Sequence, residues 1–479
     1  MTHSSDESGG PTQGTQRSEG VAVETGPREG NTAETLCSGS VSTRLSRIAE
    51  LARREPKRAF SSLHHVIDVA LLEAAYRGTR KDGARGVDGE GAVQFAANLP
   101  ERLRDLRARW VTGAYRAPAV RRVHIPKGNG EKTRPIGIPT FEDKVLQRAV
   151  TMVLTAIYEE DFLPCSYGYR PGRSAHDAVS ALREGLMEMG GGYVVELDIE
   201  CFFDTLDHGA LRGFLDRRVT DGVLRRAINK WLAAGVLENG SVSYPEDGTP
   251  QGGVISPLLA NLYLHEVLDV WFERDVKPRL RGRAFMVRYA DDAVLVFEQE
   301  EDAKRVLGVL PKRFERFGLR LHPEKTRLVP FRRPRSGSGG RRGGREGPGT
   351  FDFLGFTKYW ARSRRNYWVI KCRTAASRFA RSIGRITDWC KVNRHLPVRE
   401  QHAVLWRKMK GHFAYFGITG NQNALGRFYG AVREVWWKWL TRRSGASRRP
   451  FGWLLTLLER MPLPKPIAIH STFRTSANP

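Results

Sequence analysis

The chain has 479 residues, 40% of them hydrophobic, and its 78 Lys and Arg outnumber 52 Asp and Glu, a formal net charge of +26 at pH 7. That length allows roughly two to four domains, and so large a positive excess is typical of proteins that bind a polyanion rather than of metabolic enzymes. The sequence has no run of about 18 apolar residues and its N-terminus is polar and acidic, so neither a membrane span nor a secretory signal is expected.

Residues 1–40 are rich in Ser, Thr, Gly and Glu, lack aromatic residues and carry six acids against two arginines. Such a segment cannot bury enough apolar surface to fold, so we expect a disordered acidic tail. Its net charge of −4 leaves +30 on the rest of the chain. From Val41 the sequence becomes basic, and Leu45, Ile48 and Leu51 are spaced loosely as the apolar stripe of a helix.

Three elements with clear patterns follow. Apolar side chains within residues 142–157 recur at spacings of four, three and four, which predicts an amphipathic helix. Residues 193–199 read as a buried strand with Asp198 near its end. Residues 258–272, directly after Pro257, read as another helix.

Two apolar strand-like runs, 284–287 and 293–297, flank the stretch Tyr289-Ala290-Asp291-Asp292. Neighbouring carboxylates at the tip of such a hairpin repel each other and lose hydration, unless a cation neutralises them. Oxygen ligands at such a turn suit Mg²⁺, which binds one or two carboxylates together with substrate phosphates. The alternative is an Asp-Asp turn without chemistry.

Residues 332–349 contain six arginines and seven glycines, which predicts a flexible basic loop, and 351–356 resume a strand. The order of helix, strand, helix, hairpin and strand is typical of an α+β fold with a split βαβ topology. Residues 371–449 read as helical and hold 18 Lys and Arg against three acids. So basic a region predicts contact with RNA phosphates, with a solubilising helix face as the alternative.

Asp198 is the third acid of interest, because one carboxylate on a strand and two on a separate hairpin can converge on two metal ions. Two ions are what in-line nucleotidyl transfer needs: one activates the attacking 3′-hydroxyl and the other neutralises the leaving pyrophosphate. A strand-end cap is the alternative for Asp198. Between these acids lies the glycine-rich stretch 248–257, where Gln251 offers an amide to a base or sugar, although an ordinary turn before a helix is possible.

Seven blocks, in order, resemble the motifs of reverse transcriptases of the bacterial group II intron-encoded type. Three carry the polymerase likeness: residues 198–204, Pro250-Gln251-Gly252 and 289–292. The flanking blocks that narrow the resemblance are 134–147, 166–174, 321–326 and 353–356. Residues 411–417 and 428–429 look like the thumb and maturase (X) domain of the same family.

The resemblance implies a metal site at the matching positions. Asp198, Asp291 and Asp292 would be the catalytic residues and would hold two Mg²⁺ ions, and the backbone carbonyl of Ile199 would add a ligand.

It also implies a nucleotide site. Lys127 and Arg134 would contact the incoming triphosphate and Gln251 would lie beside the nucleotide. Phe203 would block a ribose 2′-hydroxyl, and Lys325 could protonate pyrophosphate. The alternatives are solvated charge for the cations, core packing for Phe203 and simple electrostatics for Lys325.

The implied fold is an α+β right-hand polymerase with a ferredoxin-like palm. We expect an acidic tail at 1–40, fingers at 41–190, a palm at 191–360, a helical thumb and maturase domain at 361–445, and a short C-terminal tail at 446–479.

The resemblance implies an RNA-directed DNA polymerase that also acts as a maturase, binding intron RNA to assist splicing and retrohoming. Its partners would be intron RNA, a DNA target or primer and deoxynucleoside triphosphates, with no membrane; its oligomeric state stays open. No Cys/His cluster of an endonuclease domain follows Arg449, so the endonuclease-lacking type, without second-strand cleavage, is expected.

The five cysteines are dispersed and form no Cys-x-x-Cys pair, so disulfides and zinc find little support and a reducing cytoplasm is expected. The resemblance implies that this cytoplasm is bacterial and that the protein is associated with a ribonucleoprotein. Two other interpretations remain: a retron or diversity-generating reverse transcriptase, and an RNA-binding splicing factor without polymerase activity.

Overall fold

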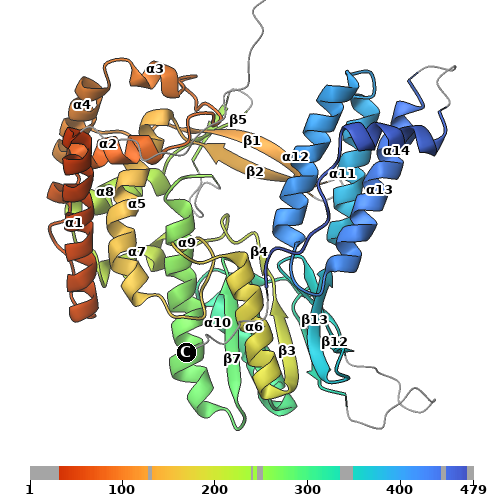
Figure 1. Ribbon diagram of the computed structural model, residues 1–479. Coiled ribbons are helices and arrows are strands. Elements are labelled where there is room, and N and C mark those ends of the chain that lie inside the picture. The colour runs from red at the N-terminus through yellow and green to blue at the C-terminus, as the bar shows by residue number, and fades with distance from the viewer. Residues whose placement is uncertain are drawn as a thin grey trace, which may run out of the picture.

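The computed structural model describes residues 32–127, 132–238, 241–244, 252–334, 349–443 and 449–471. Helices of the N-terminal part lie on one side, a sheet and its covering helices lie in the middle, and the C-terminal helices lie on the other side (Figure 1). The glycine-rich stretch 248–257, the basic loop predicted at 332–349 and the two chain ends lie partly outside these described ranges.

Helix α5 (Phe141–Asp161) is the central element of the N-terminal part and confirms the helix predicted at 142–157. Thr140 caps it by accepting a hydrogen bond from the backbone N–H of Asp143. Around it lie α1 (Thr32–Arg54), η1 (His64–Val66), α2 (Val69–Gly78), α3 (Ala92–Ala96), α4 (Leu99–Thr112), α7 (His208–Asp216) and α8 (Gly222–Leu232). A four-stranded sheet of order β2-β1-β5-β6 joins them, with β1 (Val120–Lys127), β2 (Lys132–Ile138), β5 (Val236–Glu238) and β6 (Ser241–Ser243).

Helix α1 corrects one expectation, because it begins at Thr32 and so residues 32–40 are helical rather than disordered. Once the amphipathic stretch after Val41 forms a helix, each further residue adds a hydrogen bond at little cost, so the helix extends into sequence that cannot nucleate one alone. The expectation for residues 1–31 lies outside the described residues.

The central sheet has the order β10-β3-β8-β7 and is antiparallel throughout. Its strands are β3 (Gly191–Leu197), β7 (Ala284–Tyr289), β8 (Asp292–Phe297) and β10 (Arg327–Arg332). Helix α9 (Ser256–Leu264) lies in the long connection from β3 to β7, which also contains α7, α8 and the strands β4 (Ile199–Glu200), β5 and β6, and helix α10 (Glu300–Glu315) lies in the connection from β8 to β10. This order of elements is the split βαβ topology predicted from the sequence.

Both faces of this sheet are buried, because successive side chains of a strand point to opposite sides. Along β8, Leu295 and Phe297 join the core formed with α9, α10 and the N-terminal helices. Val294 and Val296 join a second core with α6 (Ala175–Met189) and the C-terminal part. The sheet therefore links the two halves of the molecule and fixes their relative position.

The helix predicted at 258–272 is confirmed, although only its first half is a regular α-helix. After α9 the backbone continues as two π-helical stretches, η2 (His265–Asp269) and η3 (Trp271–Val276), followed by η4 (Lys277–Arg279). Such wide turns are rare and often mark functional sites. A small pair of strands, β4 (Ile199–Glu200) and β9 (Arg320–Leu321), extends from the end of β3.

The C-terminal part begins with a sheet that the sequence reading missed. Residues 351–356, expected as one strand, form β11 (Phe351–Phe353), a left-handed turn at Leu354 and Gly355, and the start of β12 (Phe356–Arg362). The helix expected from residue 371 starts later, because β13 (Trp368–Thr374) pairs with β12 along its length. Cross-strand pairing outweighs local helix preference here.

Helices α11 (Ala376–Val392), α12 (Val398–Phe416), α13 (Gln422–Leu440) and α14 (Phe451–Arg460) complete the chain (Figure 1). The stretch expected as a short C-terminal tail is well packed: α14 buries Leu454 and Leu458, and a bridge pairs His470 with Ile418. In the described residues, no helix is both long and apolar enough to span a bilayer.

Candidate active site

Strand register brings two of the predicted acids to the same end of the central sheet. In the β3–β8 pair Leu197 lies opposite Ala293, so Asp198, which follows β3, comes opposite Asp292, the first residue of β8. The expected meeting of the two acidic segments is therefore set by backbone pairing, the most precisely defined feature of a sheet.

The second acidic segment is a tight turn between β7 and β8, in which Tyr289 pairs with Asp292 across the two residues Ala290 and Asp291. Ala290 has a left-handed backbone with φ of 57°. The backbone of Gly168 lies so close that a Cβ there would be 2.3 Å from the Ala290 nitrogen. Only glycine at that position allows this approach.

Asp198 is tied to the segment that follows β9. Its carboxylate accepts a hydrogen bond from Lys325 Nζ at 2.5 Å, and its backbone carbonyl accepts one from the His322 N–H at 2.8 Å. The second bond puts Ile199 opposite Leu321 in a non-hydrogen-bonded pair. The carbonyl of Ile199 therefore points away from β9 and is not used by that strand pair.

The carboxylates influence one another. Burial, followed by the charges of Asp291 and Asp198, raises the pKa of Asp292 to about 6, while Arg378 and Arg134 oppose the rise. Within the described ranges, no three His, Cys, Asp or Glu side chains lie close enough to hold a metal ion in this arrangement. Asp198 is instead paired with Lys325, so the acids share one end of the sheet without forming a closed ligand cluster.

A cavity of about 420 Å³ opens beside the acidic turn. Asp291 and Asp292 line one side of it, and α11 contributes a row of arginines to the other side. The further lining residues used below are Tyr169, Arg378, Arg381, Ser382 and Arg385. Spacings of three, one and three put the four α11 residues on one helix face, so the cavity has an acidic floor and a basic wall.

The predicted triphosphate contacts lie on the β1–β2 hairpin. Arg134, in β2, is exposed and pairs with Ile125 of β1, and its charge reaches Asp292 as described above. Lys127 is the last residue of β1, and its side chain is outside what the structure describes. Phe203 follows β4, is half-buried and packs edge-on against Phe202 with ring centroids 5.3 Å apart.

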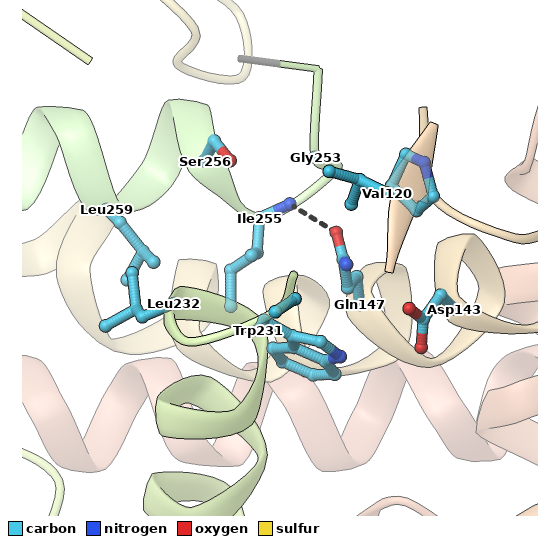
Figure 2. Close-up of a pocket in the computed structure, with 11 residues that line it drawn as sticks. Val120, Asp143, Gln147, Trp231, Leu232, Gly253, Ile255, Ser256 and Leu259 are labelled. Carbon is cyan, nitrogen blue, oxygen red and sulfur yellow. Dashed lines mark hydrogen bonds between the residues drawn. The ribbon is translucent and has the colours of Figure 1, made fainter. Parts of the chain in front are cut away.

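Gln251 itself lies outside the described residues, but the backbone immediately after it is held firmly (Figure 2). The buried side chain of Gln147, on α5, accepts hydrogen bonds through Oε1 from the backbone N–H groups of Val254, at 2.8 Å, and Ile255, at 3.4 Å. Gly252 has φ of 118°, and a Cβ there would meet the Gly137 carbonyl at 2.5 Å. Residues 252–255, the described part of this stretch that carries these contacts, thus lie between β2 and α5.

Comparison with known proteins identifies the family. A family model described as "Reverse transcriptase (RNA-dependent DNA polymerase)" matches residues 125–358, which include all three aspartates. Protein YkfC of Escherichia coli (strain K12) is 34% identical over 325 residues, covering 60% of this chain and 84% of that protein. The chain belongs to the reverse transcriptase family.

Other relatives indicate which branch of the family this is. Group II intron-encoded protein LtrA of Lactococcus lactis subsp. cremoris is 34% identical over 283 residues, 56% of this chain and 46% of LtrA. Nuclear intron maturase 3, mitochondrial, of Arabidopsis thaliana is 26% identical over 224 residues, 40% of this chain and 31% of that protein. This reverse transcriptase is thus of the group II intron-encoded type and is an RNA-directed DNA polymerase with the α+β right-hand fold. The region aligned with LtrA spans about half of that protein's length.

Sequence reasoning gave no role to several residues that shape the site of this reverse transcriptase. Gln147 could have been noticed as one of two polar side chains, with Asp143, on the buried and otherwise apolar face of α5. The arginines at 378, 381 and 385 have the spacing of one helix face, but nothing local says that this face turns toward Asp291. Tyr169, with φ of 58°, also lines the cavity, and only the tertiary structure places it there.

Proposed function

We propose that this reverse transcriptase extends a primer at the cavity beside the Asp291–Asp292 turn, with Asp198, Asp291 and Asp292 as the catalytic residues. The observation that carries the proposal is the β3–β8 register, which brings Asp198 opposite Asp292 at the edge of this cavity. Template-directed addition of deoxynucleotides to the primer 3′-hydroxyl, with RNA as the template, is the reaction that such a site supports.

The donor set suits divalent ions that prefer oxygen, and we propose two Mg²⁺ ions held by the three aspartates and the carbonyl of Ile199. Two observations support this: loss of hydration, followed by the charges of Asp291 and Asp198, raises the pKa of Asp292, and the Ile199 carbonyl points away from its neighbouring strand. When bound, such ions activate the attacking hydroxyl and neutralise phosphate charge. Lys325 holds Asp198 in the arrangement described here.

The same proposal assigns the remaining nucleotide contacts to residues on the β1–β2 hairpin and near the acidic end of the central sheet. Arg134 and Lys127, on the hairpin, would bind the triphosphate, and Gln251 would lie beside the nucleotide at the end of the stretch that Gln147 seats. Phe203 would exclude a ribose 2′-hydroxyl by contact. Lys325, whose ammonium lies at the acidic end of the sheet, is placed to give a proton to the departing pyrophosphate.

We infer domains that follow the right-hand arrangement: fingers at 41–190, a palm at 191–360 with the basic loop at 332–349, a thumb and maturase domain at 361–445, and a C-terminal segment at 446–479. Helix α6, within the range inferred for the fingers, packs on β3 and β7 and so covers one face of the palm sheet.

As a maturase, the protein would bind the intron RNA that encodes it and stabilise the active fold of that RNA. It would do so through the basic C-terminal helices, without using the aspartates. Residues 371–449 carry a net charge of +15, and exposed Arg407, Lys408 and Lys410 lie together on α12. Such a surface binds structured RNA through its backbone. We place the complex in the bacterial cytoplasm as a ribonucleoprotein.

Primer extension on poly(rA)/oligo(dT) with Mg²⁺ tests the polymerase proposal, and we expect DNA products that disappear with EDTA. Folded protein that binds the duplex and makes no product would support the splicing-factor interpretation instead. Splicing of the RNA that flanks the reading frame tests the maturase proposal, and a flanking RNA without intron structure would favour a retron or diversity-generating enzyme.

A further inference from the structure

Arg288, the residue before the acidic turn, is completely buried with 0% of its surface exposed. It has two strong hydrogen bonds to the Asp269 carboxylate, from Nε to Oδ1 at 2.7 Å and from Nη2 to Oδ2 at 2.5 Å. Nη1 donates to the Asn261 side-chain oxygen and to the Ala290 carbonyl, each at 3.0 Å, and Nη2 donates to Ser166 Oγ at 2.9 Å. A guanidinium has five N–H groups, and all five are used.

The partners come from four separate parts of the chain. Asp269 lies in η2, Asn261 in α9, Ser166 in the segment before α6, and Ala290 in the acidic turn itself. Asn261 continues the network, because its Nδ2 donates to the Gly168 carbonyl at 2.6 Å. One side chain therefore connects the turn to the helix behind the sheet and to the segment that lies against the turn.

Backbone hydrogen bonds hold the same place. The N–H of Arg288 donates to the Cys165 carbonyl and the Tyr167 N–H donates to the Arg288 carbonyl, both at 2.8 Å. Segment 165–168 thus runs beside the end of β7, where Gly168 touches Ala290. Neither the backbone hydrogen bonds of segment 165–168 nor the contact of Gly168 involves the Ala290 carbonyl, which belongs to the peptide group between Ala290 and Asp291. The Arg288 guanidinium donates a hydrogen bond to this carbonyl.

That carbonyl matters because Ala290 is left-handed, a conformation that an alanine avoids unless its surroundings impose it. The peptide group that Arg288 holds is the one that leads directly into Asp291. Rotation of this peptide would turn the Asp291 and Asp292 side chains relative to Asp198. Stability alone does not explain the network, since a buried ion pair is often no more stabilising than well-packed apolar side chains.

We propose that Arg288 is a positioning residue for catalysis, which fixes the orientation of the Asp291–Asp292 turn toward Asp198 by holding the Ala290 carbonyl. The proposal rests on the proposed polymerase function of this turn. It assigns Arg288 no contact with substrate. A bidentate and planar side chain is required, because a lysine ammonium cannot bind Asp269, Asn261, Ser166 and Ala290 together.

The rival explanation is that Arg288 only stabilises the core, and Arg218 offers a matched control for it. Arg218 is 6% exposed and donates to the Asp161 carboxylate at 2.8 Å. It also donates to the backbone carbonyls of Glu55, Arg58 and Ala52 at 2.9, 2.8 and 3.2 Å. Arg218 is thus also buried and held by several hydrogen bonds. It joins α1, α5 and the end of α7, which are far along the chain from the acidic turn.

The test compares Arg288→Lys with Arg218→Lys in the full-length protein. We expect both to lower the melting temperature, but only Arg288→Lys to lower kcat for primer extension, by about 100-fold, the effect of a misplacement near 1 Å. The Arg288→Lys variant should need about tenfold more Mg²⁺ for half-maximal rate, while KM for the deoxynucleotide changes by less than about threefold, since its binding groups are elsewhere.

Mn²⁺ binding, measured by electron paramagnetic resonance without substrate, gives a readout besides activity and should weaken in Arg288→Lys only. If Arg288→Lys does not fold, Asn261→Ala removes one partner of the same network and should lower kcat by about tenfold with the same metal dependence. Equal kinetics and Mn²⁺ binding in the Arg288 and Arg218 variants would overturn the proposal. A wild-type protein that makes no DNA would instead count against the proposed polymerase function.

Discussion

The acidic end of the central sheet and the basic C-terminal helices differ in how each is positioned. Asp198 and Asp292 are placed by strand register, and a shift of one residue would move either carboxylate to the other face. Most of the C-terminal cations on α11, α12 and α13 are exposed, and we expect each to act through its charge, so that neighbours can substitute for it. One region depends on exact geometry and the other on total charge.

The two regions meet at the cavity, where Arg378, Arg381 and Arg385 of α11 face the acidic turn. Their charges and the carboxylates line the same cavity. A single substitution at the acidic end of the sheet should therefore cause a large loss of activity, whereas substitutions on the C-terminal helices should each cause a small loss of binding.

The largest expected effect is that of Asp291→Ala, which should lower primer extension by at least about 1,000-fold, because it removes several kcal/mol of charge stabilisation. Assisted splicing should be largely retained, since the basic helices are untouched. Primer extension and splicing assays on the same preparation measure both. Loss of both activities in a folded variant would show that the two regions do not act separately.

Charge removal on α11 should come next. Replacing Arg378, Arg381 and Arg385 together with Gln should weaken primer–template binding and lower the salt dependence of log K by up to about three, one for each lost phosphate contact.

The matched control replaces Arg407, Lys408 and Lys410 of α12, which are exposed away from the cavity lining. It should weaken intron RNA binding and leave the KM for primer–template nearly unchanged. Filter binding at several salt concentrations distinguishes the variants. Equal effects of both triple variants on primer binding would mean that the cavity wall has no special role.

A smaller effect is expected from Phe203→Val, which should increase ribonucleotide incorporation by about 10-fold, since one apolar contact contributes about 1–3 kcal/mol of discrimination. Phe202→Val is the control, because Phe202 is buried in the core and should lose stability without losing sugar discrimination. Competition between dTTP and UTP on a poly(rA) template measures the ratio. An unchanged ratio in Phe203→Val would leave core packing as the role of this ring.

The smallest effect on activity should come from Asp143→Asn, which instead changes stability. Asp143 is 2% exposed and accepts a hydrogen bond from the Tyr115 hydroxyl, and burial raises its pKa from 3.8 to about 7. Between about pH 4 and 7 the folded state keeps a proton that the unfolded state loses, so this carboxyl's contribution to stability falls as pH rises. Asparagine does not titrate and removes this slope.

Urea unfolding at pH 5 and pH 8 checks this prediction. The variant should gain in stability relative to the wild type between these two pH values, by at most about 3 kcal/mol, because pH 5 lies about two units below the raised pKa. A difference between the two proteins that does not change with pH would contradict the raised pKa.

Much of the fold was predictable because its signals are local. The helix at α5, the strand β3 and the β7–β8 hairpin follow from periodicities of about 3.6 and 2 residues, and the split βαβ order follows from their succession. The missed sheet β11-β12-β13 and the helical start of α1 depend on neighbours that are distant or come later in the chain. The roles of Lys127 and Gln251 stay predictions, since neither side chain lies within the described residues.

The sequence by itself determined which residues we propose for the chemistry, because a carboxylate or a basic helix face is recognised from its type and spacing. Only the tertiary structure decided how they meet: that Asp198 comes opposite Asp292, that the arginines of α11 turn toward Asp291, and that Arg288 binds Ser166 and Asn261. These contacts join segments many residues apart, and pairing and packing of the whole chain select them, so no local pattern contains them.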